Sequence, residues 1–394
     1  MGNDFHSIGE HVKGSSFRTS EGADEFYLMI NSSEESTFSG ELDHLFDSYM
    51  TAMDNYGLSE DTLVFSRFYI SDIANQKKKL RESKIFAVSQ KGAVSTIQQC
   101  PVKNGSLSLL VYHVKKDNII FKKELFTYDD ENRRNGAIIH GKHYDLFWIA
   151  NFYGIGPPDT YCQTTEVFQS FNDILNNKGM TLFDNAMRTW VYVRDIDNNY
   201  NDMIESRKAF FKDHGLTPET RYIASTGIEG FSKEVNSLVA LDGYAVNNLE
   251  KEQIVRMEAL NHLSPTIDYG VTFERGTRVR FGDRSHLHIS GTASIDITGK
   301  VMYISDVKKQ TLRTIENIRA LLASQGADLG NMAYIIAYIR NIKDGNRVRE
   351  VLESEIPGEV PVVFLESSVC RPDWLVELEG VAIIPDSNDF PAFF

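Results

Sequence analysis

WVYVRDI, residues 190–196, decides the fold, because two other stretches of the chain repeat its pattern. RFYISDI occupies residues 67–73, and AYIRNI occupies residues 337–342. Each stretch places apolar β-branched or aromatic residues around a central tyrosine, which is typical of a short strand. The three tyrosines are widely separated (192 − 69 = 123 and 338 − 192 = 146 residues), so we infer a repeat of domain size.

The order of elements around these strands also repeats. A helix-period segment precedes each strand, and a second helical stretch follows it, at residues 74–85, 200–214 and 347–355. A closing strand comes next: LSLLVYHV at residues 107–114, LVALDGYAV at 238–246 and LVELEGVAI at 375–383. One matching strand can arise by chance, since apolar alternation with tyrosine is common in sheets. The shared order of patterns favours three similar α+β units.

The amino-acid composition of the chain excludes several classes of function. The chain holds 41 basic and 55 acidic residues, a net charge of −14, and its densest basic block is Lys77-Lys78-Lys79. We therefore expect no nucleic-acid partner. No apolar run approaches the roughly 18 to 20 residues that a membrane span needs, and the first residues lack a hydrophobic signal core. We expect no membrane association and a cytoplasmic location. The three cysteines form no Cys-x-x-Cys pair and are interpreted as reduced thiols.

The last third of the chain carries a family resemblance. It reads HLHISGTASID at residues 286–296, DVKKQTLRTIENIRALLASQG at 306–326, AYIIAYIRNIKD at 333–344 and SSVCRPDWLVELEGVAI at 367–383. This succession resembles the RidA/YjgF family. The resemblance implies repeated RidA/YjgF-like (chorismate-mutase-like) units, each a mixed β-sheet backed by two helices. With the repeat, it predicts units at residues 1–116, 117–247 and 248–394, the last carrying the active site.

A longer resemblance extends upstream. MRTWVYVRDI at residues 187–196, YIASTGIEG at 222–230, YGVTFERG at 269–276 and ISGTASI at 289–295 are similar to the chorismatase family. Residues 245–268 depart from that family's pattern, so substrate contacts from this segment do not carry over. The resemblance implies cleavage of the enolpyruvyl ether of chorismate, without a cofactor.

Arg371 and Glu377 are the first candidate site residues. Arg371 precedes the closing strand, where RidA-like proteins use an arginine to bind a carboxylate, and a guanidinium offers a planar two-pronged donor for that purpose. Glu377 shares a strand face with Glu379. A buried, unpaired carboxyl usually has a raised pKa, which suits a general acid. The alternative is a solvated face with an Arg371–Glu379 salt bridge.

The repeat supplies an internal comparison. Aligning the closing strands puts Ala240 of the second unit opposite Glu377, and the first unit's closing strand has no acidic residue. Cys100-Pro101 aligns with Cys370-Arg371 in this interpretation. Only the third unit keeps both groups, so we predict one active site in the chain.

The chorismatase resemblance implies further substrate-binding residues. Arg275 matches a family arginine that would bind a second carboxylate; alternatively, Arg275, Arg278 and Arg280 alternate on an exposed edge strand. Gly276 and Cys370 resemble the branch that releases 3-hydroxybenzoate, although Cys370 can equally be a small buried residue. The resemblance adds the following residues: Tyr269, Thr226 and Gly227.

A metal site is not predicted. His286 and His288 share a strand face, but no third ligand of matching character stands nearby. Thr226 and Gly227 can line a cleft between the second and third units, or belong to a glycine-bearing loop.

The sequence therefore predicts a chorismatase-like enzyme with Glu377 as general acid, acting on a small-molecule carboxylate, with 3-hydroxybenzoate as the favoured product. The alternatives are a RidA-type enamine/imine deaminase and a non-catalytic small-metabolite-binding protein. The RidA/YjgF resemblance implies a homotrimer, whereas three repeats in one chain predict a monomer that acts as a pseudo-trimer.

Overall fold

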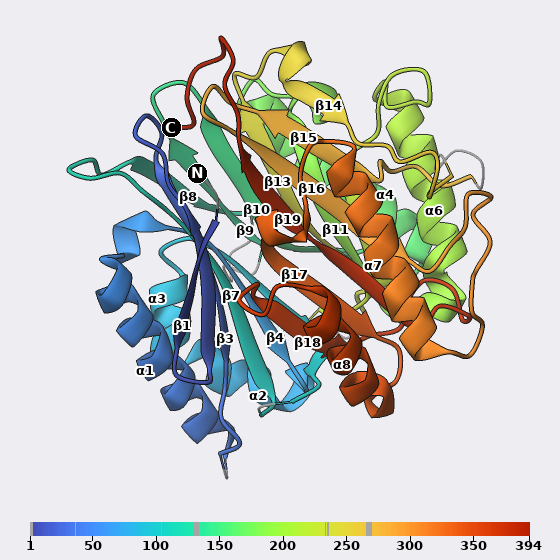
Figure 1. The fold of residues 1–394 in the computed structure, drawn as a ribbon, viewed down its shortest axis with the longest axis horizontal. Coiled ribbons are helices and arrows are strands. Elements are labelled where there is room, and N and C mark those ends of the chain that lie inside the picture. Colours follow the sequence, from blue (N-terminus) through green and yellow to red (C-terminus); the bar gives the residue numbers. More distant parts are fainter. Residues whose placement is uncertain are drawn as a thin grey trace.

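The computed structural model describes residues 3–35, 37–103, 105–128, 134–232, 234, 236–264 and 270–394. It contains three mixed β-sheets with helices on their outer faces (Figure 1), as the sequence predicts. The blue helices of the first unit, the green helices of the second and the orange and red helices of the third lie on three different sides. No helix in these ranges is long and apolar enough to cross a membrane.

Each unit shares one basic succession, three strands, a long helix, a strand, a second helical segment and two further strands, to which the first unit adds β6 (Cys100–Pro101) and the second adds α5 (Leu182–Asn185). The first contains β1 Asn3–Ile8, β2 Val12–Phe17, β3 Asp24–Asn31, α1 Phe38–Tyr56, β4 Leu63–Ile70, α2 Ile73–Arg81, α3 Lys84–Ser89, β5 Ala93–Gln98, β6 Cys100–Pro101 and β7 Leu107–Lys115. The second contains β8 Lys122–Thr127, β9 Asn135–His140, β10 Asp145–Tyr153, α4 Thr160–Asn177, α5 Leu182–Asn185, β11 Ala186–Val193, α6 Ile196–Asp213, β12 Ala224–Glu229 and β13 Val239–Asn247. The third contains β14 Ile254–Arg256, β15 Gly276–Arg280, β16 Arg284–Ala293, α7 Val307–Ala323, β17 Met332–Ile339, α8 Gly345–Glu355, β18 Val362–Glu366 and β19 Val376–Pro385.

The strand order is also the same in all three sheets. It is β1-β2-β3-β7-β4-β5 in the first, β8-β9-β10-β13-β11-β12 in the second and β14-β15-β16-β19-β17-β18 in the third, where β6 of the first unit adds a last strand. The final pair of each unit, such as β17 and β18, is parallel, and the other pairs are antiparallel. The closing strand is therefore central in every sheet and buried on both faces.

The long helix of each unit starts at a side-chain cap. Thr37 accepts a hydrogen bond from the Gly40 N–H, Asp159 from the Cys162 N–H and Asp306 from the Lys309 N–H. Such caps satisfy N–H groups that the first turn leaves unpaired. The apolar side of each helix then packs on its own sheet.

Two sequence predictions about local structure are wrong. The helix expected over residues 74–85 is two helices, because the Ser83 side chain accepts a hydrogen bond from the Phe86 N–H and starts α3. The second error is the omission of a strand before each closing strand. β5, β12 and β18 occupy that place, and Thr226 and Gly227 lie on β12 rather than in a loop.

The three units contact one another in a cycle. The end of β5 bridges to Phe231 of the second unit, the end of β12 bridges to Val369 of the third, and β18 pairs with Pro101 of the first. Aromatic residues of all three sheets, including Tyr112, Trp148 and Tyr334, share one central core. The three sheets thus surround a pseudo-threefold axis within one chain.

Candidate active site between the second and third units

A cleft between the second and third units collects most of the predicted site residues. Its cavity volume is about 30 Å³, and α6, β12, β16 and β19 all contribute to its walls. Six of the eight predicted residues line it: Thr226, Gly227, Arg275, Cys370, Arg371 and Glu377. Gly276 does not, and Tyr269 falls in residues 265–269, outside the described ranges.

Glu377 lies in the centre of the third sheet. Its strand neighbours are Ala293 on β16 and Tyr338 on β17, and the side chain is only 4% exposed. Burial, followed by the charge of Glu379, raises the pKa of Glu377 to about 8, although Arg188 and Arg275 act in the opposite direction. The carboxyl is therefore mainly protonated at neutral pH, as a general acid requires.

Gly291 makes room for this carboxyl. A Cβ atom added at Gly291 would lie 2.0 Å from Glu377 Oε1 and 3.0 Å from the Thr226 methyl group. Any other residue would displace the carboxyl or the strand. Gly291 is thus a sterically required part of the site that the sequence reasoning did not single out.

Glu379 is held by four donors. Trp190 Nε1 donates at 2.8 Å and Tyr338 Oη at 2.9 Å, and the Arg188 guanidinium and the Thr226 hydroxyl also donate to it. Thr226 Oγ1 in turn accepts a hydrogen bond from the Gly291 N–H at 2.9 Å. The alternative of a solvated face with an Arg371–Glu379 salt bridge is wrong, because Glu379 is buried and pairs with Arg188.

Three guanidinium groups line the cleft. Arg275 is 6% exposed and donates from Nε and Nη2 to the Ser264 carbonyl oxygen at 3.3 and 3.2 Å. The exposed edge-strand alternative for Arg275 is therefore wrong, and β14, not β15, is the edge strand. Arg371 is half-buried, and its Cζ lies 5.0 Å from the centre of the Trp374 ring.

Arg207 is the third cation, and the sequence reasoning missed it. It comes from α6, is 1% exposed, and donates to the Thr272 hydroxyl at 3.0 Å and the Ser225 hydroxyl at 3.4 Å. The described residues whose charges act on it are Tyr200, Cys370 and Tyr222, and none of these is a carboxylate. A buried guanidinium with only hydroxyl partners is costly unless a ligand supplies the negative charge.

Cys370 faces the same cleft. Burial and the nearby Glu377 raise the pKa of its thiol to about 12, and Tyr200 of α6 lies beside it. The thiol is therefore neutral at physiological pH and a poor nucleophile. Its position suits a side chain that shapes the cleft.

Gly276 and His286 make packing and hydrogen-bond contacts outside the cleft. A Cβ atom at Gly276 would lie 2.9 Å from Met257 Sδ, so this glycine permits close packing behind the cleft. His286 is buried and hydrogen-bonds Glu25 at 2.9 Å. In the described part of the chain, no group of three or more His, Cys, Asp or Glu side chains could hold a metal ion.

The strand registers identify the counterparts of Glu377. Tyr338 pairs with Glu377, Tyr192 with Ala240 and Tyr69 with Ser108. The acid is therefore absent from the corresponding positions of both other units. The alignment of Pro101 with Arg371 is wrong, because the bridges place Pro101 at the position of Val369.

Comparisons with known proteins agree with this fold. Residues 279–384 match the family model described as endoribonuclease L-PSP, the RidA/YjgF family, which confirms the resemblance of the third unit. A 3-hydroxybenzoate synthase of Streptomyces hygroscopicus is 24% identical over 278 residues, covering 65% of this chain and 79% of that protein. A chorismatase of the same organism is 27% identical over 214 residues, covering 49% of this chain and 60% of that protein. A crystal structure of chorismatase, 17% identical, superimposes with a TM-score of 0.62 over 82% of this chain and 93% of that one, and so has the same fold.

Proposed function

We propose that this protein is a chorismatase-type enzyme that cleaves chorismate to pyruvate and a hydroxybenzoate. One observation carries the proposal: a buried carboxyl with a pKa of about 8, Glu377, lies in a cleft lined by three guanidinium groups. The similarity to a 3-hydroxybenzoate synthase and a chorismatase of Streptomyces hygroscopicus supports it.

The charges of the cleft suit this substrate. Chorismate carries two carboxylates, one on the ring and one on the enolpyruvyl group. Arg371, Arg275 and Arg207 provide three cations around one space, and guanidinium groups bind carboxylates with paired, directional hydrogen bonds. We assign the two carboxylates to these arginines.

Glu377 is the proposed proton donor. It transfers its proton to the methylene carbon of the enolpyruvyl group, and positive charge develops on the adjacent ether carbon. Water then adds to that carbon and returns a proton to Glu377, and the resulting hemiketal breaks its ether bond to release pyruvate and a ring diol. Loss of the C4 hydroxyl together with the C3 hydrogen, as water, converts the diol into 3-hydroxybenzoate. A positioned acid of this kind accelerates a reaction by roughly 10²- to 10⁴-fold. Pyruvate and hydroxybenzoate together contain the atoms of chorismate, so the proposed reaction uses no cofactor.

The favoured product is 3-hydroxybenzoate. Cys370 lines the cleft and can shape the space around the ring, whereas Gly276 lies outside it. Any influence of Gly276 on the product therefore acts through its neighbour Arg275. The relative named 3-hydroxybenzoate synthase supports this choice.

The test is incubation of the purified protein with chorismate, with pyruvate followed by a coupled assay and the aromatic product by chromatography. We expect Glu377→Gln to lower turnover far more than binding, and Arg371→Ala to weaken both. Arg347→Ala is the matched control, because Arg347 is exposed on α8, where it pairs with Asp344. Absence of pyruvate above background would refute the proposal. Turnover of a 2-aminoacrylate-type imine instead would favour a RidA-type deaminase.

We also propose that one chain forms the complete assembly. The cleft is built from two units of the same chain, and the three units contact one another in a cycle. Light scattering on a sizing column should give a mass near 44.7 kDa. A mass three times larger would show a homotrimer.

A further inference from the structure

The turn before the last closing strand carries Arg371 and forms one wall of the active-site cleft. Residues 369–375, which we call the Arg371 turn, lie between β18 and β19, and Cys370, Arg371 and Trp374 line the cleft. Residues outside helices and strands hold a ligand at a defined place only where other side chains fix their backbone. The contacts of this turn therefore decide where the Arg371 guanidinium lies.

Arg340 binds the backbone of the Arg371 turn. It follows directly after β17 and is largely buried. Its Nε donates to the Trp374 carbonyl oxygen at 3.1 Å, and its Nη2 donates to the carbonyl oxygens of Val369 and Arg371, the latter at 3.1 Å. A guanidinium reaches several carbonyl oxygens at once because its N–H groups lie in one plane and point in different directions. One side chain thus fixes the turn at its beginning and near its end.

Asp197 connects Arg340 to the opposite wall of the cleft. It is the second residue of α6, the helix that brings Tyr200 and Arg207 into the cleft. The Asp197 carboxylate accepts from Arg340 Nη1 at 2.9 Å and from Nη2 at 3.0 Å. Such a paired arrangement fixes the relative orientation of the two groups as well as their distance. The position of Arg371 relative to Arg207 therefore depends on this ion pair.

The repeat shows that the contact between an arginine and this turn belongs to the fold of two units. Arg194 follows Tyr192 by two residues, as Arg340 follows Tyr338. Its Nε donates to the Ser237 carbonyl oxygen at 3.1 Å, in the segment before β13 that corresponds to the Arg371 turn. The backbone N–H of Arg194 also donates to the carbonyl oxygen of the next residue, Leu238, at 2.8 Å. The second unit thus uses the same device.

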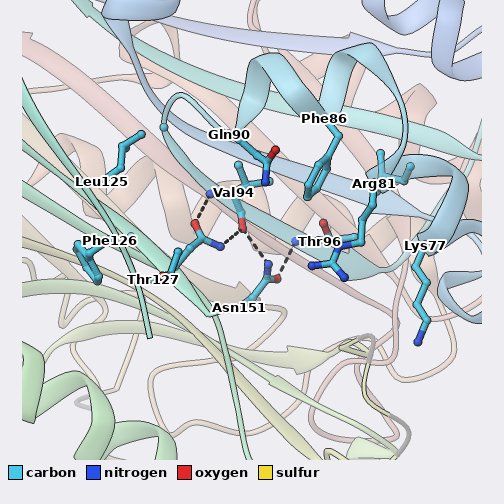
Figure 2. Close-up of a pocket in the computed structure, with 14 residues that line it drawn as sticks. Lys77, Arg81, Phe86, Gln90, Val94, Thr96, Leu125, Phe126, Thr127 and Asn151 are labelled. Carbon is cyan, nitrogen blue, oxygen red and sulfur yellow. Dashed lines mark hydrogen bonds between the residues drawn. The ribbon is translucent and has the colours of Figure 1, made fainter. Parts of the chain in front are cut away.

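The ion pair with Asp197 has no counterpart in the repeat. Aligning YISDIA, residues 69–74, with YVRDID, residues 192–197, puts Ala74 in the place of Asp197. The first and second units are joined by a neutral contact instead (Figure 2): Asn151 accepts from the Thr96 N–H at 2.8 Å and donates to the Val94 carbonyl oxygen at 2.8 Å. The ion pair therefore occurs at the interface that contains Glu377.

We propose that Arg340 and Asp197 are positioning residues that hold Arg371 and Arg207 at the spacing of the two substrate carboxylates. Neither side chain lines the cleft. Arg340 acts through the backbone of the Arg371 turn, and Asp197 acts through Arg340. The proposal rests on the proposed function of the cleft. It assigns the end of β17 and the start of α6 a part in substrate binding.

The first test is steady-state kinetics of pyruvate release with Arg340→Lys, which keeps the positive charge but not the planar two-pronged donor. The ratio kcat/KM should fall at least tenfold, mainly through a higher KM, because Arg371 binds a carboxylate in the substrate and in the transition state alike. Asp197→Asn should cause a smaller loss of the same kind. Arg319→Lys is the matched control and should change kcat/KM less than twofold, because Arg319 forms an exposed ion pair with Glu355 at 3.1 Å in the same unit.

The Arg371→Ala chain separates positioning from general damage. In this chain Arg340→Lys should lower kcat/KM by less than a further twofold, since its effect passes through the side chain that has been removed. An equal loss with and without Arg371 would overturn the proposal. An unchanged kcat/KM in the single variant Arg340→Lys would also overturn it.

Hydrogen exchange tests the same contact without a ligand. Arg340→Lys should speed exchange of the backbone amides of the Arg371 turn at least fivefold, whereas Arg319→Lys should leave them unchanged. The variant should stay folded, because Gln310 of α7 bonds independently to the Asp373 carbonyl oxygen and the Leu375 N–H, both at 2.9 Å. Unchanged exchange of the turn in Arg340→Lys would refute the role of Arg340. Absence of pyruvate release by the wild-type chain would instead refute the proposed function, and exchange would still decide what Arg340 does.

Discussion

Glu379→Gln should move the alkaline limit of activity to lower pH. Glu379 lies two residues from Glu377 on the same face of β19, and its charge is the second cause, after burial, of the raised pKa of Glu377. The protonated form of Glu377 is the active one in the proposed reaction. Activity is therefore present below the pKa of Glu377 and is lost as the pH rises through about 8.

The size of the shift follows from the strand geometry. Residues i and i+2 on one strand face are roughly 7 Å apart. Two unit charges at that distance repel each other by roughly 2.4 kcal/mol at an effective dielectric constant of 20, which corresponds to roughly 1.7 pKa units. Removal of the Glu379 charge should bring the pKa of Glu377 to roughly 6. Arg188, which loses its partner carboxylate, acts in the same direction.

The assay is kcat/KM for pyruvate release between pH 5 and pH 10. Tyr338→Phe is the matched control, because it removes a 2.9 Å hydrogen bond to Glu379 but no charge. It should shift the alkaline limit by less than about 0.5 unit. Thermal melts establish that both variants are folded. An unchanged alkaline limit in folded Glu379→Gln would refute the electrostatic reasoning.

Three further predictions concern buried groups. Glu377→Gln should stabilise the protein above pH 8 by up to about 5 kcal/mol. The pKa of Glu377 is raised from 4.5 to about 8 in the folded protein, so the wild-type chain loses stability as the pH rises between these two values, and glutamine avoids this loss. Urea unfolding at pH 5 and pH 9 should show the gain mainly at pH 9. Gly291→Ala should lower turnover at least a hundredfold, since its Cβ collides with Glu377 Oε1, and normal kcat in a folded variant would contradict this. Arg67→Met should destabilise the protein by about 3 to 5 kcal/mol, because it leaves Asp242 buried without its partner at 3.0 Å. Adding Asp242→Leu should recover part of that loss in the same unfolding measurement.

The repeat was predictable because its signal is local. Tyr69, Tyr192 and Tyr338 sit in strands whose apolar pattern survives in all three units, and the structure places them at equivalent positions of three sheets. β12 was not predictable in the same way. Its residues, Ala-Ser-Thr-Gly-Ile-Glu, lack an apolar period, and tertiary pairing with β11 makes them a strand.

Parts of the site depend on contacts that no short motif encodes. Arg207 belongs to a helix whose sequence indicates a charged surface face, yet α6 turns this arginine into the cleft. Arg188 and Glu379 are 191 residues apart and meet only because two units pack together. The sequence alignment of the first unit with the third is wrong by two residues. Cys100 and Cys370 are the same residue type, but the strand bridges align Pro101 with Val369 and not with Arg371.

The difference between the second and third units extends beyond one acid. β16 and β10 both change register at the same place, between Ile289 and Thr292 and between Ile149 and Phe152. The irregular segment holds Gly291 in one case and Asn151 in the other. Gly291 leaves space for the Glu377 carboxyl, whereas Asn151 has a left-handed backbone (φ 57°) and its side chain bonds to β5. The chemistry proposed for the third unit therefore depends on an acid and on the glycine that makes room for it.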